Sequence, residues 1–440
     1  MNFDRNTVIG FIALAILFIG YFFYNAREQQ AYQVQKAKQD SIANVSKPKP
    51  DVATQQIDSV RADSFQKATS AGTLSQFING PEQLVYVENS VFKIAFTNKG
   101  GQPKWVELKN FRGPDSANVR LAASDFDKLA YTINTAANQT ADITNFYFTG
   151  GQVVSNPDKT QTITFQLPAQ NSSIVHQFVI RPDKYMVDFN LQINGVNQLL
   201  SNNTLNFIWQ NKAVQLQKDL EYEKQQSQIA YREGTDYDHS SAMSDNNETF
   251  KGPLNWVAVK QQFFNTTFIN KNNFSSGDIE WKSPKVGNTV VQTVAHLKMQ
   301  LPAGENATVP LAFFYGPTDY KILKQYSNDM ESMVNLGSGV FAFVKYINRW
   351  IILPVFDFFH KFISNYGIVI LLLTLFIRLC ISPLTYSSYL SGAKMKVLRP
   401  EIDKLKAKYG SDQQAISMDQ MKLFREAGVN PLGGCIPALF

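Results

Sequence analysis

The sequence predicts a membrane α-helical protein that also carries an all-β domain. Two stretches, 8–24 and 366–386, are long and apolar enough to cross a membrane. Between them, apolar and polar residues alternate with the period of two that is typical of half-buried strands. The mean hydropathy of −0.20 over 440 residues is too polar for a chain that lies in the membrane throughout. The hydrophobic segments therefore belong to the two ends, with a water-exposed domain between them.

The first apolar stretch, 8–24, contains 17 residues without a charge, which is the short end of the range for a spanning helix. The Tyr-Asn-Ala sequence at 24–26 is a poor match to a small-x-small cleavage site. We therefore favour an uncleaved signal anchor over a cleaved signal peptide. The segment 27–80 is rich in Gln, Lys, Ser, Ala and Asp and cannot bury enough apolar surface to order itself. A passive spacer is favoured there over a tether that sets reach.

Residues 81–325 are predicted to form a β domain built as a sandwich of antiparallel sheets. Alternation of apolar and polar residues is clearest at 291–301. Turn-forming clusters, such as the Asn-Lys-Gly-Gly sequence at 98–101, separate the strand-like windows. Many short strands at this spacing are typical of a sandwich. The stretch 211–247 is polar and weakly patterned, so we expect a long excursion on the surface there.

A connector and an amphipathic helix are predicted in 326–365. The stretch 340–362 is strongly aromatic, but it carries Lys345 and Arg349, which are four residues apart and share one helical face. Charges at bilayer depth are costly. A helix that lies in the membrane interface, broken near Pro354, is therefore favoured over another spanning helix.

Arg378 is the only residue of 366–386 that is ionisable near neutral pH. An Arg at mid-bilayer depth costs roughly 2.5–3.5 kcal/mol on insertion scales, and such residues usually mark functional sites. On a helix, Thr374, Ser382 and Thr385 lie within about 40° of Arg378. The four residues form a polar stripe that runs toward the cytoplasmic end of the predicted span.

The polar stripe predicts a water-filled groove that is open to the cytoplasm. Pro383 removes a backbone hydrogen bond near the same end and frees the carbonyl of Leu379. A fixed positive charge in such a groove attracts acidic groups that enter from the cytoplasm. The alternative is a structural Arg, neutralised by an acidic residue on a helix that this sequence does not include.

A basic helical hairpin is predicted in 391–428, with helices that end at Gly410 and Gly428. Lys394, Lys396 and Arg399 are expected to hold anionic lipid headgroups, at about 1 kcal/mol each. The alternative is a mobile arm that meets incoming chains or the ribosome.

The topology follows from the same charges. The positive-inside rule places the basic hairpin in the cytoplasm. Two spans then put the N-terminus in the cytoplasm and the β domain outside. The flanks of the first span argue weakly against this orientation, because 27–50 holds five Lys or Arg residues and only Arg5 precedes the span.

No cofactor or metal site is expected. The two cysteines, Cys380 and Cys435, lie outside the β domain and indicate no disulfide framework. The four histidines are scattered without the spacing of metal ligands. No nucleic acid is expected to bind directly.

Together, these patterns divide the chain into seven segments. They are a signal-anchor span (1–26), a flexible linker (27–80), the β domain (81–325), the connector with the interfacial helix (326–365), the second span (366–390), the cytoplasmic hairpin (391–428) and the start of a further membrane segment at which the sequence is expected to be truncated (429–440).

Several motifs resemble those of one known family. The runs LTLFIRLCISPLTYSSYLSGAKMKVLRPEIDKLKAKYG and KLFREAGVNPLGGCIPALF are the most specific, and NKGGQPKWVELKNF, LNWVAVKQQFF and FFYGPTDYKIL agree with its periplasmic domain. The chain resembles the YidC-type membrane protein insertases of Gram-negative bacteria, in the YidC/Oxa/Alb family. The resemblance covers essentially the whole chain.

The resemblance implies a multi-pass protein of the inner membrane with a periplasmic, mutarotase-like β-supersandwich. Arg378 matches the family's groove charge, which is thought to receive acidic residues in the N-terminal tails of nascent membrane proteins. The hairpin matches a mobile cytoplasmic loop that the family needs for activity. The implied function is insertion and folding of membrane proteins, alone or with the Sec translocon, and not enzymatic catalysis. Further spans are expected beyond Phe440.

Two rival functions remain open from the residues alone. The first is a membrane-anchored carbohydrate-binding or epimerase-like periplasmic protein, which needs a His and a carboxylate that converge in a pocket. His176 and His296 lie in strand-like segments, but no motif pairs either with an acid. The second rival is a transporter subunit.

Overall fold

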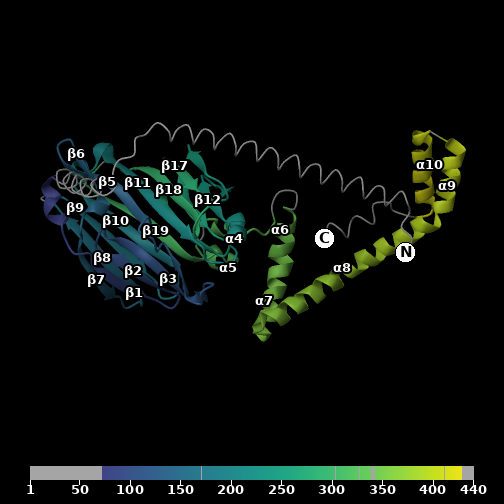
Figure 1. Ribbon diagram of the computed structural model, residues 1–440, viewed down its shortest axis with the longest axis horizontal. Coiled ribbons are helices and arrows are strands. Elements are labelled where there is room, and N and C mark those ends of the chain that lie inside the picture. The colour runs from purple at the N-terminus through teal and green to yellow at the C-terminus, as the bar shows by residue number, and fades with distance from the viewer. Residues whose placement is uncertain are drawn as a thin grey trace. The chain divides into compact units, whose positions relative to one another are not determined.

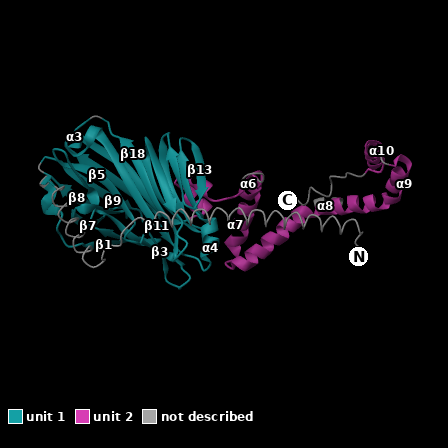
Figure 2. Cartoon of the chain, turned by 45° about the horizontal axis from the view of Figure 1, so that its top comes forward, with its two compact units in different colours: residues 1–317 teal, residues 318–440 magenta. Residues whose placement is uncertain are grey.

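The computed structural model describes residues 72–428, apart from 170, 303, 327, 338–341 and 411. The predicted signal anchor, nearly all of the linker and the segment 429–440 lie outside the described residues. The chain divides into two compact units, residues 1–317 and residues 318–440 (Figure 2). Each unit is described by itself.

The first unit is built from antiparallel β-strands (Figure 1). The strands are β1 (Leu84–Glu88), β2 (Phe92–Thr97), β3 (Gln102–Arg112), β4 (Asn118–Leu121), β5 (Lys128–Ala136), β6 (Gln139–Asp142), β7 (Thr149–Ser155), β8 (Gln161–Pro168), β9 (Ser173–Ile180), β10 (Met186–Asn194), β11 (Thr204–Val214), β12 (Gln228–Glu233), β13 (Asp236–Ser241), β14 (Asn246–Phe250), β15 (Leu254–Lys260), β16 (Phe264–Phe274), β17 (Ser276–Lys282), β18 (Thr289–Gln300) and β19 (Asn306–Pro317). Short helical turns join them at η1 (Gly72–Phe77), η2 (Ile143–Asn145), α3 (Val196–Leu199), η3 (Ser201–Asn203) and α4 (Leu220–Gln226).

The strands form three sheets. A nine-stranded sheet has the order β13-β12-β15-β16-β19-β10-β9-β8-β7, a six-stranded sheet has the order β14-β17-β18-β11-β5-β6, and β1 to β4 form a four-stranded sheet. Ring contacts tie the smaller sheets to the largest one, because Phe207 of β11 lies 5.9 Å from Phe268 of β16 and Phe96 of β2 lies 4.9 Å from Phe178 of β9, between ring centroids. The prediction of an all-β sandwich of antiparallel sheets is confirmed.

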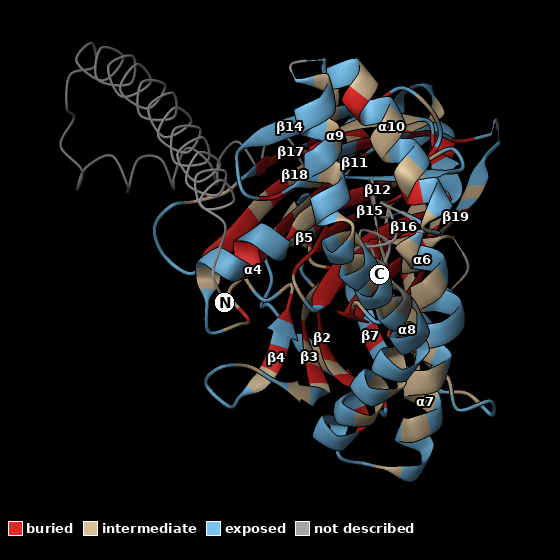
Figure 3. Ribbon diagram, turned by 90° about the vertical axis from the view of Figure 1, so that its right-hand side faces the viewer, coloured by how far each residue is buried: buried red, intermediate tan, exposed pale blue. Residues whose placement is uncertain are grey.

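The core of the β domain follows the predicted alternation. In β18, Val291, Ala295 and Leu297 are buried while His296 between them is exposed. Such alternation places every second side chain on the inner face of a sheet. Figure 3 shows the buried residues gathered along the strands. The strongest sequence signal for a strand therefore reports the inner face of the six-stranded sheet.

The surface excursion expected at 211–247 is wrong. The segment contains the end of β11, α4, β12, β13 and the start of β14, and β12 pairs with both β13 and β15. Its pattern is weak for two reasons. β13 is an edge strand and largely exposed, while the inward side of α4 carries Glu223, a polar residue that is nonetheless buried. Hydropathy alone does not recognise a buried carboxylate that is held by hydrogen bonds.

The second unit is helical. Its elements are α5 (Tyr320–Lys324), η4 (Met330–Met333), α6 (Val344–Ile347), the π-helical turn η6 (Asn348–Ile352), α7 (Leu353–Phe362), α8 (Tyr366–Val397), α9 (Arg399–Tyr409) and α10 (Gln413–Glu426).

The aromatic helix, defined here as α6, η6 and α7 together, does not break near Pro354. Its backbone stays in the right-handed helical region at Asn348 and at Ile352, and the chain leaves it only at Ile363. Proline lacks the N–H that an α-helix interior needs. The π-helical turn just before Pro354 shifts the hydrogen-bond register at this point, and turns of this kind accommodate such interruptions. The predicted break is therefore replaced by a local change of helix type.

Helix α8 continues past the expected boundary at residue 390 and ends at Val397. Pro383 lies inside it without ending it. Lys394 and Lys396 therefore belong to the last turn of α8, and Arg399 begins α9. Gly392 lies inside α8 and does not end it.

Candidate functional site

The candidate site lies on α8, whose start is fixed by a side-chain cap. Asn365 accepts hydrogen bonds from the backbone N–H groups of Gly367 and Ile368 at the N-terminus of the helix. The segment Tyr366–Pro383 is the one helix within the described part of the chain that is long and apolar enough to cross a membrane. At the corner with α7, the rings of His360 and Tyr366 stack with centroids 4.7 Å apart.

The two threonines of the polar stripe bond to the helix itself. The hydroxyl of Thr374 donates to the carbonyl of Ile370 at 2.8 Å, and that of Thr385 donates to the carbonyl of Ile381 at 3.0 Å. Such back-bonding satisfies the hydroxyl proton inside an apolar segment. The oxygen lone pairs stay available to accept hydrogen bonds from a ligand or from water.

Arg378 and Ser382 are exposed side chains on the same helix. Among the described residues, no hydrogen bond or ion pair reaches the guanidinium of Arg378. The structure thus places the four predicted residues of the polar stripe along one continuous helix. The water-filled groove stays a prediction.

The apolar side chains of α8 are also exposed. Within Tyr366–Pro383 most side chains are exposed, and Leu379 retains 72% of its accessible surface. Val369 is the buried exception. A helix this apolar needs lipid or other helices around it, because exposed apolar surface is unfavourable in water.

The hairpin carries the other predicted cations. Lys394, Lys396 and Arg399 are all exposed at the junction of α8 and α9. Helices α9 and α10 close on each other, since the hydroxyl of Tyr409 donates to the carboxylate of Asp419 at 2.6 Å. The cations are therefore presented at the start of a folded hairpin.

Two of the three histidines of the β domain, His176 and His296, do not form the site that an epimerase would need. His176 is buried, and its ring nitrogens lie 2.6 Å from the hydroxyl of Tyr131 and 2.8 Å from the carbonyl of Gly101. His296 lies 3.0 Å from the carboxylate of Asp278, on an exposed face. Sequence reasoning missed this pair because the register of β17 against β18 brings it together.

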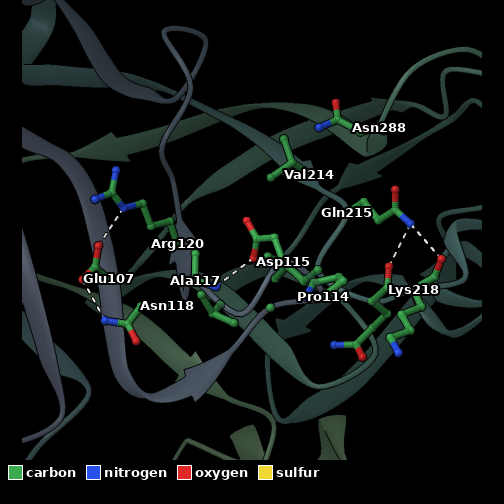
Figure 4. A pocket seen from close by; sticks show the side chains of 14 residues that line it. Glu107, Pro114, Asp115, Ala117, Asn118, Arg120, Val214, Gln215, Lys218 and Asn288 are labelled. Atoms are coloured by element: carbon green, nitrogen blue, oxygen red, sulfur yellow. Dashed lines mark hydrogen bonds and ion pairs between the residues drawn. The ribbon is translucent and has the colours of Figure 1, made fainter.

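A cleft in the β domain has a volume of about 660 Å³ and is lined by the β3–β4 loop and by residues 214–218 (Figure 4). Several of its polar side chains already have partners within the protein. Glu107 accepts from Arg120 at 2.7 Å and from Asn118 at 2.9 Å, and Gln215 donates to the carbonyl of Gln217 at 2.8 Å. Neither His176 nor His296 lines this cleft. Within the described ranges, no cluster of three or more potential metal ligands occurs.

Two family profiles together match most of the chain. The profile described as YidC periplasmic domain matches residues 84–352, and the profile described as 60Kd inner membrane protein matches residues 358–440.

Relatives named membrane protein insertase YidC align with 99% of the chain. The protein of Parabacteroides distasonis is 30% identical and 72% of its length is covered, and that of Bacteroides fragilis is 30% identical with 71% covered. Among solved structures, an active YidC insertase with its first transmembrane domain resolved is 17% identical, with a TM-score of 0.29, over 82% of this chain and 69% of that one. A galactose mutarotase related enzyme from Lactobacillus acidophilus is 10% identical, with a TM-score of 0.35, over 53% of this chain and 97% of that one.

Proposed function

The chain belongs to the YidC family of membrane protein insertases, and from this premise we propose that the polar stripe of α8 receives acidic residues of incoming chains. The protein is an insertase of the bacterial inner membrane with a periplasmic β domain. Its substrates are nascent membrane proteins. The acidic N-terminal tails of these substrates are the part that we assign to Arg378.

The observation that carries the proposal is the state of Arg378. Its guanidinium is exposed on an otherwise apolar helix and has no partner among the described residues. Charges interact more strongly in a poorly solvated environment than in water, so a carboxylate that enters beside Arg378 is stabilised there. The hydroxyls of Thr374, Ser382 and Thr385 offer further hydrogen bonds along the same side. The stripe thereby lowers the free energy needed to bring a short polar tail into the bilayer.

The proposal includes a topology and further partners. The basic hairpin lies in the cytoplasm, the N-terminus lies on the same side, and the protein is multi-pass. Lys394, Lys396 and Arg399 hold anionic lipid headgroups and stand where a chain that leaves the ribosome arrives. The insertase acts alone or beside the Sec translocon.

The test combines crosslinking with a charge reversal. Crosslinkers at positions 374, 378 and 382 are expected to capture nascent chains with acidic tails, whereas a crosslinker at 376, about 160° around the helix from 378, is not. Arg378→Glu is expected to lower insertion of these substrates more than Arg378→Ala does, because it repels their carboxylates. Substrates without acidic tails serve as the control. Equal capture at 376 and 378, with unchanged insertion by Arg378→Glu, would contradict the proposal.

A further inference from the structure

A second polar site lies in the helical unit, away from the polar stripe. A cleft of about 490 Å³ opens between α5 and the aromatic helix. Cationic side chains from both elements line it, Lys321 and Lys324 from α5 and Arg349 from the aromatic helix. All three are exposed at the cleft rather than buried in the unit.

The cations of the cleft are not balanced by the acidic residue beside them. Asp357 pairs with Lys321. Lys324 and Arg349 have no carboxylate within ion-pair distance among the described residues. Their charged groups instead lie 5.7 Å and 5.9 Å from the centre of the Tyr320 ring. Two like charges at one ring leave the cleft with an excess of positive charge, which an anion relieves.

The two cations have complementary donor geometries. A guanidinium presents planar paired N–H donors that suit phosphate oxygens, and an ammonium adds a compact point charge. Arg349 and Lys324 together thus offer what a phosphate group binds. The cleft is open, so that a headgroup reaches these donors without displacing protein side chains.

The surface beside the cleft indicates where the anion comes from. Trp350 lines the cleft and is 73% exposed, and Ile351, Phe358 and Phe362 are exposed along the same aromatic helix. Tryptophan favours the headgroup level of a membrane, and exposed apolar side chains at this density favour burial in lipid. Residues 84–352 match the periplasmic-domain profile. Lys324, Arg349 and Trp350 lie within this range, whereas Phe358 and Phe362 lie in the range of the inner-membrane profile, so the cleft is placed where the periplasmic part meets the membrane.

We propose that the cleft of Lys324, Arg349 and Tyr320 binds the phosphate of an anionic phospholipid in the periplasmic leaflet of the inner membrane. The acyl chains lie along the exposed apolar side chains of the aromatic helix. This site is independent of the polar stripe, which opens to the cytoplasm. It fixes the depth at which the connector to the β domain meets the membrane.

The test uses the whole chain in detergent, titrated with phosphatidylglycerol, with retained lipid counted by native mass spectrometry. The double variant Lys324→Gln with Arg349→Gln is expected to weaken retention about 25-fold, since a basic residue that contacts the headgroup is worth about a fivefold change. The matched control is Lys345→Gln with Lys361→Gln, which removes the same charge from the aromatic helix outside the cleft. It is expected to change retention less than about twofold, as exposed cations outside a site contribute little.

Two parallel probes separate the sources of phosphate. Phosphatidylcholine, whose headgroup has no net charge, is expected to be retained more weakly than phosphatidylglycerol by the unaltered chain. Inorganic phosphate is expected to leave phosphatidylglycerol in place. Equal retention by the two double variants overturns the proposal, and so does displacement of the lipid by inorganic phosphate at similar concentrations, which would assign the cleft to a free ion.

Discussion

The β domain and helix α8 differ in whether their side chains are buried and have partners within the protein. Inside the β domain, Glu223 is a buried polar side chain with partners in the fold, since it accepts from the backbone N–H groups of Leu216 and Gln217 at 2.9 Å and 3.0 Å. On α8, the apolar side chains are bare and Arg378 has no partner among the described residues. Figure 3 shows the contrast between buried strands and exposed helix. The domain is stabilised by its own contacts, whereas a helix this apolar needs lipid or other helices around it.

The largest loss of stability is expected from the removal of a large side chain in the core of the β domain. Phe189 is buried and stacks on Phe178 and Phe313, with centroids 4.6 Å and 6.1 Å away. Phe189→Ala is expected to lower the free energy of unfolding of the β domain by about 3–5 kcal/mol. Denaturation followed by tryptophan fluorescence measures it, because four of the five tryptophans lie in this domain.

The matched change on the helix is Leu379→Ala. The side chain is 72% exposed, so the same denaturation curve is expected to shift by less than about 0.5 kcal/mol. Comparable losses from the two variants would mean that α8 is part of the same cooperative core.

A fall in pH is expected to destabilise the β domain because His176 is buried. Burial lowers the pKa of His176 to about 4, from about 6.5 in the unfolded chain. As the pH falls below about 6.5, His176 is protonated in the unfolded chain but not in the folded domain. The free energy of unfolding is therefore highest above that pH and declines toward pH 4. The loss reaches about 3 kcal/mol.

The control for this titration is His176→Gln, which keeps one donor and one acceptor beside Tyr131 and the carbonyl of Gly101. Unfolding is measured for both proteins between pH 7 and pH 4. The difference between them isolates His176 from Asp127 and Glu223, whose pKa values burial raises and which act with the opposite sign. Parallel pH curves for the two proteins would refute this role for His176.

What the sequence predicted well was local. The alternation at 291–301 identified the buried face of β18, and helical spacing alone put Thr374, Arg378, Ser382 and Thr385 on one helix. Both patterns depend on the geometry of a single element. The sequence was misleading at 211–247, because a buried carboxylate such as Glu223 looks like surface until its donors are known.

What the sequence could not predict depends on pairing between distant elements. His296 meets Asp278 only through the register of two strands. The cleft of Lys324 and Arg349 needs α5 to lie beside the aromatic helix, and no periodicity carries that information.

The hairpin sharpens the comparison, because it is the part of the helical unit that closes on itself. The hydroxyl of Tyr409 donates to Asp419 at 2.6 Å, and Ile416 and Phe424 are buried. Tyr409→Phe is expected to lower the local opening free energy of α10 by about 1–2 kcal/mol, as for a hydrogen bond to a charged acceptor. Hydrogen exchange of the α10 amides measures it. Tyr386→Phe, at an exposed position of α8, is the control and is expected to leave this exchange unchanged.

A small effect is also expected at an exposed ionisable pair on the surface of the β domain. The side chains of His296 and Asp278 are 46% and 50% exposed. Asp278→Asn is therefore expected to change the free energy of unfolding by less than about 1 kcal/mol, because water and salt screen such pairs. Asp188→Asn provides the buried counterpart, since the carboxylate of Asp188 pairs with Arg181 and Lys271. This variant is expected to lower the free energy of unfolding by about 2 kcal/mol or more. Two results would contradict this view of the exposed face of β17 and β18. One is an equal loss of stability in the two variants, and the other is an epimerase activity that Asp278→Asn removes.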